Sequence, residues 1–283
     1  MDRLDEALSL HWAKVHHIGN NNPVIFQVRN LRNNKKPNPN KLFVIEGIWA
    51  FNAAISSPIE FVCFLLCPDI LYTPELRNSI ASHFTDTDYI YILSQKVFSS
   101  ISERDKPDGF MALCKFKSRS LADIPYKDSI IMVLDGLEIP GNIGTIFRSC
   151  DGSNASAVFI CNKKARMTHP KVIKGSMGGV FNVPFYEFVN TEDCIAWLRQ
   201  RNFKVFLADT RSQIDYHDHN YTGNIALVAG SERYGIERIW YDYPYVNTVS
   251  IPMLGKCDSL NVAIASTIIL YEIRHFKSRG NTL

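Results

Sequence analysis

The sequence lacks the features that mark membrane proteins and disulfide-rich proteins. Its apolar runs, such as residues 61–67, are far shorter than the roughly 20 residues that a membrane-spanning helix requires. Its 7 cysteines are odd in number, none forms a Cys-x-x-Cys pair, and several lie inside apolar runs. We therefore expect reduced, buried thiols in a cytoplasmic protein. The acidic start, residues 1–6, has the pattern of neither a signal peptide nor a basic transit peptide.

A strong excess of one charge is also absent. Lysine and arginine number 31 and aspartate and glutamate 28, so the net charge is only +3. Such a balance does not by itself indicate a nucleic-acid partner, and local clusters must be examined instead. The 46% hydrophobic content, with 15 glycines and 13 prolines, excludes a disordered or collagen-like chain. At roughly 150 residues per domain, a length of 283 residues predicts two domains.

Alternating strand and helix patterns predict two α/β domains. The first, at 1–116, opens with a helix and a polar loop; a linker at 117–127 precedes the second at 128–277, and 278–283 form a flexible tail. The five consecutive apolar residues of 130–134 predict a strand covered on both faces. Expected strands lie at 42–46, 61–67, 89–93, 110–115, 130–134, 157–161, 204–208, 225–229 and 246–251. Expected helices lie at 47–56, from Pro74 with Thr73 as N-cap, from Ser94, at 191–201 and at 258–276.

Three long loops follow predicted strands of the second domain, at 135–144, 230–236 and 251–262. In open α/β sheets, ligands bind beyond the carboxyl ends of the strands. The first and third loops also run directly into predicted helices. These loops are therefore where we expect a site.

The first loop lacks the groups that bind nucleotide phosphates. Gly136 and Gly141 match the outer glycines of a P-loop, but Asn142 and Ile143 stand where Lys and Ser or Thr are needed. The glycines also lack the spacing of a dinucleotide-binding fingerprint, which argues against a Rossmann-type methyltransferase as well. The run Asp215-Tyr-His217-Asp-His219 has no cysteine partner, so we expect no metal site.

Five polar or charged side chains on these loops form a candidate catalytic site. Each has a structural explanation when taken singly, as a helix cap, a helix-terminal charge or a surface ion pair. Their shared location at the strand ends of one sheet favours a common site. Arg148, one and a half helical turns after Asn142, is expected to reach back toward it. The five are Asn142, Arg148, Glu232, Ser259 and Asn261.

These segments resemble the three motifs of the SpoU/TrmH family of RNA 2′-O-ribose methyltransferases, within the SPOUT superfamily. The first is Asn142-Ile-Gly144-Thr-Ile-Phe-Arg148, and the second is Gly230-Ser-Glu232-Arg-Tyr-Gly235-Ile. The third is Ile251-Pro-Met253, then Gly255, then Ser259-Leu-Asn261-Val. The chain is similar to rRNA-modifying members such as the thiostrepton-resistance methyltransferases. More weakly, Phe43-Val-Ile-Glu46-Gly47 resembles the start of the family's L30e-like RNA-binding domain.

The resemblance implies a fold and a cofactor. It implies a deep trefoil knot in the C-terminal SPOUT-type α/β domain, a homodimer formed through that domain, and a smaller L30e-like α/β domain before it. S-adenosylmethionine would lie bent in the knot, held near Gly230, Ile251, Met253 and Leu260. One departure is Asn154, where the family usually has glycine; because asparagine also adopts a left-handed helix-ending conformation, we expect the backbone to be retained.

The resemblance also implies roles for the five site residues. Arg148 would bridge the ribose 2′-oxygen and a phosphate, and Asn142 would orient Arg148 or the ribose. Glu232 would hold the Asn142 region or the arginine. Ser259 and Asn261 would fix the third loop and help build the partner's RNA site. A second serine of the family is replaced by Ala263, so that hydroxyl has no counterpart here.

Two clusters of basic residues without acidic neighbours are candidates for RNA contact, although a solvated surface is the alternative for each. Both clusters would make binding dependent on salt. The cluster in the first domain is Arg29, Arg32, Lys35, Lys36 and Lys41. The cluster in the second is Lys163, Lys164, Arg166, Lys171 and Lys174.

The sequence therefore predicts an S-adenosylmethionine-dependent RNA 2′-O-ribose methyltransferase acting on rRNA. A tRNA 2′-O-methyltransferase and a catalytically silent RNA-binding protein of the same fold are the alternatives. A methyltransferase acting on a base is a further one, against which the position of Arg148 argues.

Overall fold

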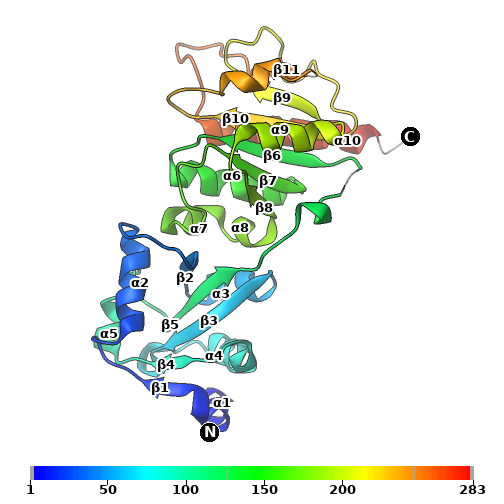
Figure 1. Cartoon of the computed structure of the whole chain (residues 1–283). Coiled ribbons are helices and arrows are strands. Elements are labelled where there is room, and N and C mark those ends of the chain that lie inside the picture. Colours follow the sequence, from blue (N-terminus) through cyan, green and yellow to red (C-terminus); the bar gives the residue numbers. More distant parts are fainter. Residues whose placement is uncertain (1–2, 126, 245, 281–283) are drawn as a thin grey trace. The chain divides into compact units, whose positions relative to one another are not determined.

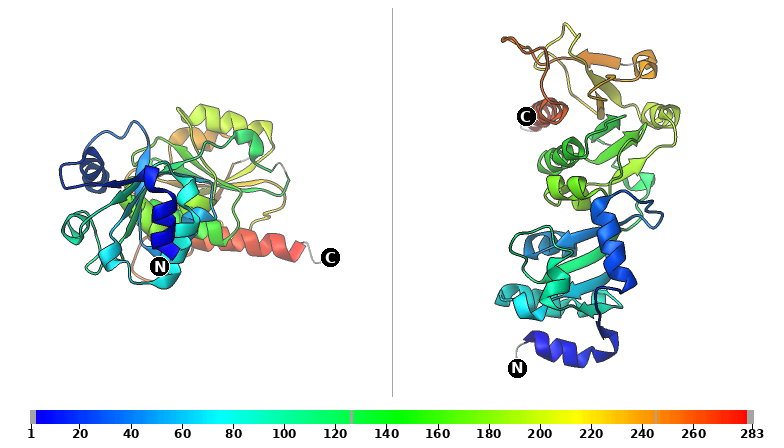
Figure 2. Two further views of the ribbon diagram at one scale, coloured as in Figure 1. Left: turned by 90° about the horizontal axis from the view of Figure 1, so that it is seen from below. Right: turned by 90° about the vertical axis from the view of Figure 1, so that its left-hand side faces the viewer.

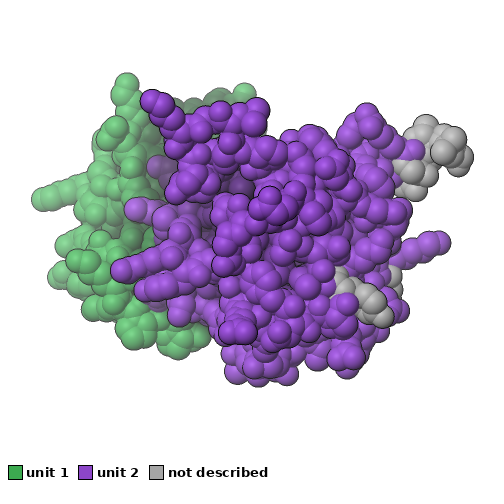
Figure 3. Space-filling model, turned by 90° about the horizontal axis from the view of Figure 1, so that it is seen from above, with its two compact units in different colours: residues 1–118, 168–170 green, residues 119–167, 171–283 purple. Residues whose placement is uncertain are grey.

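The computed structural model describes residues 3–125, 127–244 and 246–280. The chain divides into two compact units, one of residues 1–118 with 168–170 and one of 119–167 with 171–283 (Figure 3). The sequence placed a linker at 117–127, where this division begins. No helix among the described residues is long and apolar enough to cross a membrane.

The first unit is a five-stranded mixed sheet with strand order β1-β4-β3-β5-β2 (Figure 1). Strands β1, β4 and β3 are parallel, and β5 runs antiparallel to both β3 and β2. The strands are β1 (Val15–His17), β2 (Leu42–Glu46), β3 (Ile59–Leu66), β4 (Ile90–Ile92) and β5 (Phe110–Phe116). The helices are α1 (Arg3–Leu10), α2 (Pro23–Asn33), α3 (Ile48–Ile55), α4 (Pro74–Ser82) and α5 (Gln95–Ser99).

The two faces of this sheet bury different side chains. Ile25 and Val28 of α2 pack with Leu65 and its aliphatic neighbours on one face. On the other face, the ring of Phe51 from α3 lies 5.8 Å from that of Phe64 and 4.7 Å from that of Phe110, between centroids. Because side chains alternate along a strand, β3 supplies residues to both cores.

Helix α2 corrects the expectation of a polar loop over 28–41. The Asn22 side chain accepts a hydrogen bond from the Val24 amide at 3.0 Å, Pro23 starts the helix, and Asn34 ends it in a left-handed conformation with φ 49°. Arg29 and Arg32 are therefore helical, and only the segment after Asn33 is a loop.

Other local differences are small. Strand β1 was not expected, because three residues are too few to show a period. Pro74 begins α4 as expected, but the Thr73 side chain makes no capping hydrogen bond.

The second unit is a six-stranded, entirely parallel sheet with order β11-β9-β10-β6-β7-β8. Every residue of β6, β7 and β10 is buried, which confirms that 130–134 is a strand covered on both faces. The strands are β6 (Ile130–Asp135), β7 (Ala157–Cys161), β8 (Phe185–Glu187), β9 (Lys204–Ala208), β10 (Ile225–Gly230) and β11 (Val246–Val249). The helices are α6 (Pro140–Gly152), α7 (Pro170–Ser176), α8 (Gly179–Asn182), α9 (Thr191–Gln200) and α10 (Val262–Gly280).

The closing helix α10 packs against α6 and β10 (Figure 2). The hydroxyls of Ser149 and Thr267 are hydrogen-bonded at 2.6 Å between the two helices. Arg274 of α10 donates to the carbonyls of Ser153 and Asn154, at 2.7 and 2.6 Å. Asn154 has φ 54°, which confirms the left-handed conformation expected there. Helix α6, which carries the first motif, is thus fixed at both its middle and its end.

The bounds of α10 differ from the expected 258–276 at both ends. The Asn261 side chain accepts from the Ala263 amide at 2.9 Å, so the helix begins at Val262 and 258–261 stay outside it. At the other end, buried Lys277 donates to Asp128 at 2.5 Å and to the Gly223 carbonyl, and the helix continues to Gly280. The expected tail is therefore helical over 278–280, while 281–283 lie outside the described residues.

Candidate functional site

Three of the five predicted site residues meet at the carboxyl edge of the second sheet. Asn142, in the first turn of α6, donates from Nδ2 to Oε1 of Glu232 at 2.6 Å. Its Oδ1 accepts from Nδ2 of Asn261 at 3.1 Å. The other Glu232 oxygen accepts from the Glu138 amide at 3.3 Å. One side-chain amide therefore joins all three motif loops, which are far apart in the sequence.

The loop that carries Glu232 is a tight turn that requires glycine at its start. A Cβ on Gly230 would lie 2.3 Å from the carbonyl carbon of Gly235, so no side chain fits there. Gly235 itself has φ +73°, and its amide donates to the Ser231 carbonyl at 2.9 Å. The two ends of the turn are thus held together by backbone contact.

A cluster of polar residues that the sequence analysis missed anchors the end of this turn. The carboxylate of Asp135, the last residue of β6, accepts from the Glu237 amide at 2.8 Å and from Asn162 at 2.7 Å. Asn162 also donates to the Glu237 carboxylate at 2.7 Å. Burial raises the pKa of Asp135 even though these hydrogen bonds favour its charged form. The only signal in the sequence was the position of these residues at strand ends.

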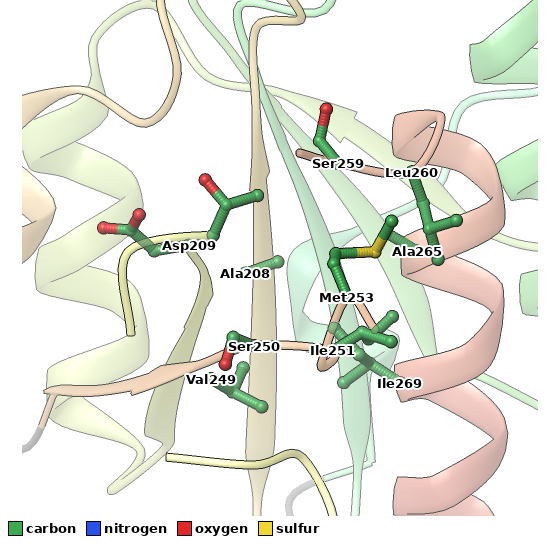
Figure 4. A pocket seen from close by; sticks show the side chains of 11 residues that line it. Ala208, Asp209, Val249, Ser250, Ile251, Met253, Ser259, Leu260, Ala265 and Ile269 are labelled. Carbon is green, nitrogen blue, oxygen red and sulfur yellow. The ribbon is translucent and has the colours of Figure 1, made fainter. Parts of the chain in front are cut away.

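A pocket lies between the ends of β9 and β11 and the start of α10. Its volume is about 360 Å³, counting space open to solvent. Three of the four predicted cofactor residues, Ile251, Met253 and Leu260, line it, and Figure 4 shows Met253 extending toward Leu260 and α10. Gly230 is not among its lining residues.

Ser259 belongs to this pocket and not to the hydrogen-bonded group around Asn142. It lines the pocket, and its hydroxyl donates to the neighbouring Asp258 carboxylate at 3.2 Å. Asn261, two residues on, reaches Asn142. The third loop therefore contributes Ser259 to the pocket and Asn261 to the hydrogen-bonded group around Asn142.

The residues that line the pocket fit S-adenosylmethionine. Its apolar wall suits an adenine ring, and its polar groups suit a ribose and an amino-acid end. The apolar wall is formed by Ala208, Ile251, Met253, Leu260, Ala265 and Ile269. The polar groups are Asp209, Thr210, Ser250 and Ser259. Asp209 and Thr210 were not predicted, although they follow strand β9 as the other loops follow their strands.

Asp209 is held in its charged form at the border of this pocket. Burial raises its pKa, but hydrogen bonds from Arg211 and Tyr241 outweigh that effect and lower the pKa to about 2. Arg211 donates to both carboxylate oxygens, at 3.0 and 2.9 Å. The carboxylate of Asp209 is therefore ionised at neutral pH, and Arg211 balances its charge.

Arg148 lies outside the hydrogen-bonded group. Its side chain is exposed on α6, and among the described residues it makes no hydrogen bond or ion pair with Asn142, Glu232 or Asn261. Six residues along a helix correspond to a rotation of about 240°, so Arg148 and Asn142 do not share one face. Its role stays a prediction.

The structure corrects part of the basic cluster in the first unit. Arg32 forms ion pairs with Glu46 at 2.7 Å and Glu103 at 3.2 Å, and its side chain is only 12% exposed. An arginine bound in this way presents little charge to phosphate, so Arg32 is not among the RNA contacts that we propose. Arg29 is half-buried and donates to Asn20 and Ser100. Lys35, Lys36 and Lys41 are exposed.

The basic residues of the second unit differ among themselves. Lys163 pairs with Glu187 at 2.8 Å. Lys164, Lys171 and Lys174 are exposed, and Arg166 is half-buried. The two histidines of the run 215–219 contact other parts of the same unit. His217 lies 3.2 Å from the Glu272 carboxylate, and a ring nitrogen of His219 lies 3.1 Å from the Thr248 carbonyl.

Comparison with known proteins gives a consistent result. The model of the SpoU rRNA methylase family matches residues 129–271, and that of the MRM3-like substrate binding domain matches residues 22–112. The 23S rRNA (guanosine(2553)-2′-O)-methyltransferase RlmP of Bacillus subtilis is 26% identical over 246 residues, which cover 87% of this chain and 94% of that protein. The 23S rRNA (uridine(2479)-2′-O)-methyltransferase of Streptomyces viridochromogenes is 30% identical over 189 residues, or 64% of each chain. The crystal structure of an AdoMet-bound rRNA methyltransferase from Sinorhizobium meliloti superimposes with a TM-score of 0.82, at 26% identity, over 93% of this chain and 98% of that one.

Proposed function

This chain belongs to the SpoU rRNA methylase family, and from that premise we propose that it methylates a ribose 2′-hydroxyl of ribosomal RNA with S-adenosylmethionine as cofactor. The observation that carries the proposal is the chain of hydrogen bonds from Asn261 through Asn142 to Glu232, directly beside a pocket that suits the cofactor. The similar proteins named as 23S rRNA 2′-O-methyltransferases support ribosomal RNA over tRNA as the substrate. They also favour a ribose over a base as the acceptor.

The pocket residues would hold the cofactor. Ile251, Met253 and Leu260 would contact the adenine, and the polar groups of Thr210 and Ser259 would bind the ribose or amino-acid end of the cofactor. When bound, S-adenosylmethionine supplies an activated methyl group on a sulfonium sulfur. The protein's remaining task is to align the acceptor oxygen and to stabilise the negative charge that develops on it.

We assign that stabilisation to Arg148. A guanidinium keeps its proton at neutral pH, so Arg148 acts as a donor to the 2′-oxygen and to an adjacent phosphate rather than as a base. Asn142 would present its amide next to the ribose, with both of its polar atoms fixed by Glu232 and Asn261. Since Arg148 stands outside that group, RNA or a second subunit would complete the site.

We further propose that the second unit forms the family's trefoil knot and a homodimer. The loop 251–261 and α10, which would close the knot, carry the third motif and the pocket. Ile264 and Tyr271 lie two helical turns apart along α10 and are 49% and 48% exposed. An apolar stripe of this kind on a helix suits burial against a second copy. The cytoplasm, where ribosomal RNA is found, is the expected location.

The decisive experiment is mass spectrometry of ribonuclease-digested rRNA and tRNA from cells with and without the gene. We expect one ribose-methylated nucleotide to disappear from rRNA without the gene, and to reappear when purified protein and S-adenosylmethionine are added.

Calorimetric titration should show binding of S-adenosylhomocysteine but not of ATP or NAD. A flat titration with folded protein would favour the silent RNA-binding alternative instead.

For the first unit we propose an L30e-like fold that binds the RNA substrate, through Lys35, Lys36 and Lys41. Changing Lys35 and Lys36 together to glutamine should weaken rRNA binding at all sequences alike, because phosphate contacts carry no sequence information. The negative slope of log affinity against log salt should become shallower by up to about 1.5, because two phosphate contacts are lost. Filter binding at several salt concentrations measures this.

The matched control for that pair is the double change of Lys96 and Lys106, two exposed lysines elsewhere in the same unit, to glutamine. It removes the same charge and should leave the slope nearly unchanged. Equal slopes for all three proteins would mean that the loop after α2 is merely solvated.

A further inference from the structure

The loop that carries Glu232 also displays an exposed aromatic ring, that of Tyr234. Tyr234 is 74% exposed, although a tyrosine ring is normally at least half-buried. The guanidinium carbon of Arg233, which is also exposed, lies 5.4 Å from the centroid of that ring. The two side chains therefore form a stacked cation–π pair on the surface of the turn.

The backbone beneath this pair is held rigidly. The Ser231 hydroxyl accepts from the amides of both Arg233 and Tyr234 at 3.2 Å. The Gly235 amide closes the turn onto the Ser231 carbonyl, and Asp135 anchors the Glu237 amide just beyond it. The pair thus projects from a turn that hydrogen bonds hold at both of its ends.

That place is next to the reaction site. Glu232, whose carboxylate binds Asn142, is two residues from Tyr234, and two residues of chain span at most about 7 Å between Cα atoms. Each side chain of the pair can therefore reach a nucleotide bound at or beside the position that Asn142 faces. Positive charge on Arg233 suits a polyanion, and a flat exposed ring suits the face of a nucleobase.

We propose that Arg233 and Tyr234 form a stacking platform for an unpaired base of the RNA substrate, at or next to the methylated nucleotide. This inference rests on the proposed function and adds a requirement to it: the target nucleotide lies in a single-stranded loop or bulge. Bases within a duplex are already stacked on both faces, so the platform would select against them.

The test uses full-length protein, S-adenosylmethionine with a labelled methyl group, and deproteinised rRNA from cells that lack the gene. Tyr234→Ala should raise the KM for this rRNA by about tenfold or more, the scale for one lost base–aromatic stack, with kcat changed far less. Tyr234→Trp should keep a KM near that of the unaltered protein. Affinity for S-adenosylhomocysteine should stay the same in both variants, because the pocket residues lie on other loops. Val189→Ala, at a 97% exposed apolar residue of the same unit, is the control and should change nothing.

Each other outcome overturns the proposal in a distinguishable way. An unchanged KM in Tyr234→Ala, with normal transfer, removes the platform and leaves the proposed function intact. A parallel loss of S-adenosylhomocysteine affinity, or a Trp variant as impaired as the Ala variant, would mean that Tyr234 has a structural role. If the unaltered protein methylates no RNA, the proposed function fails and the platform with it.

Discussion

Replacing Arg148 with alanine should lower methyl transfer to rRNA by at least about a hundredfold, the usual scale for one lost donor to charge developing in a transition state. Most of the loss should be in kcat, because the charge on the 2′-oxygen is absent before the methyl group moves, whereas loss of the phosphate contact should raise KM to a smaller extent. Its side chain is exposed and, among the described residues, makes no hydrogen bond or ion pair with Asn142 or Glu232, so we expect the fold to tolerate its loss. S-adenosylhomocysteine affinity should therefore be unchanged, and calorimetry beside steady-state kinetics separates the two effects.

Two comparison variants make the Arg148 result specific. Arg148→Lys keeps the charge but loses the planar fork that contacts two oxygens at once, so it should recover only part of the activity. Arg199→Ala removes an exposed arginine from another helix of the same unit, α9, and should leave turnover unchanged. Near-normal turnover in Arg148→Ala would mean that another group stabilises the 2′-oxygen.

Gly230→Ala should reduce turnover by about a hundredfold or more, through displacement of the loop that carries Glu232. The new Cβ would lie 2.3 Å from the carbonyl carbon of Gly235 and 2.4 Å from the amide nitrogen of Ile236. These are backbone atoms, so the turn must move, and the 2.6 Å hydrogen bond between Glu232 and Asn142 cannot survive the shift. Steady-state kinetics measures the loss, and S-adenosylhomocysteine titration shows whether Gly230 also touches the cofactor.

The matched control is Gly141→Ala, one residue before Asn142. A Cβ there meets nothing within 4 Å, and the residue already lies in the first turn of α6. Alanine should be tolerated, with full turnover and a gain in stability of up to about 1 kcal/mol, because the unfolded chain loses conformational freedom. Equal turnover in both variants would contradict the argument from close backbone approach.

The candidate site was predicted from the sequence as a set of residues, but not as an arrangement. Asn142, Glu232 and Asn261 stand out because amide and carboxylate side chains follow strands, where parallel sheets bind ligands. The tertiary structure shows that Asn142 binds both of the others, and that Ser259 belongs to the pocket instead. Which side chains touch depends on loop paths across the sheet edge, and no local pattern encodes those.

The sequence also did not show which charged side chains are paired with one another inside the fold. Arg29 and Arg32 belonged to a run without acidic residues, which favoured a surface for phosphate. The acid that neutralises Arg32 is Glu46, on a strand of the same unit, and the ion pair forms only when α2 folds against that sheet. Likewise, Asp135 and Glu237 lie 102 residues apart, and only the fold brings them into contact.

The amino-acid sequence was sufficient to predict the strands and backbone conformations that depend on neighbouring residues alone. Runs of apolar residues such as 130–134 and 157–161 became buried strands nearly to the residue, because a strand covered on both faces needs apolar side chains at every position. Asn154 took the left-handed conformation that its short polar side chain permits. Sheet order, the polar group around Asn142 and the pocket needed the tertiary structure. They depend on contacts between separate segments, such as those of Asn142 and Asn261, which lie 119 residues apart. Hydrophobic periodicity indicates whether a residue is buried, but not which residues it packs against.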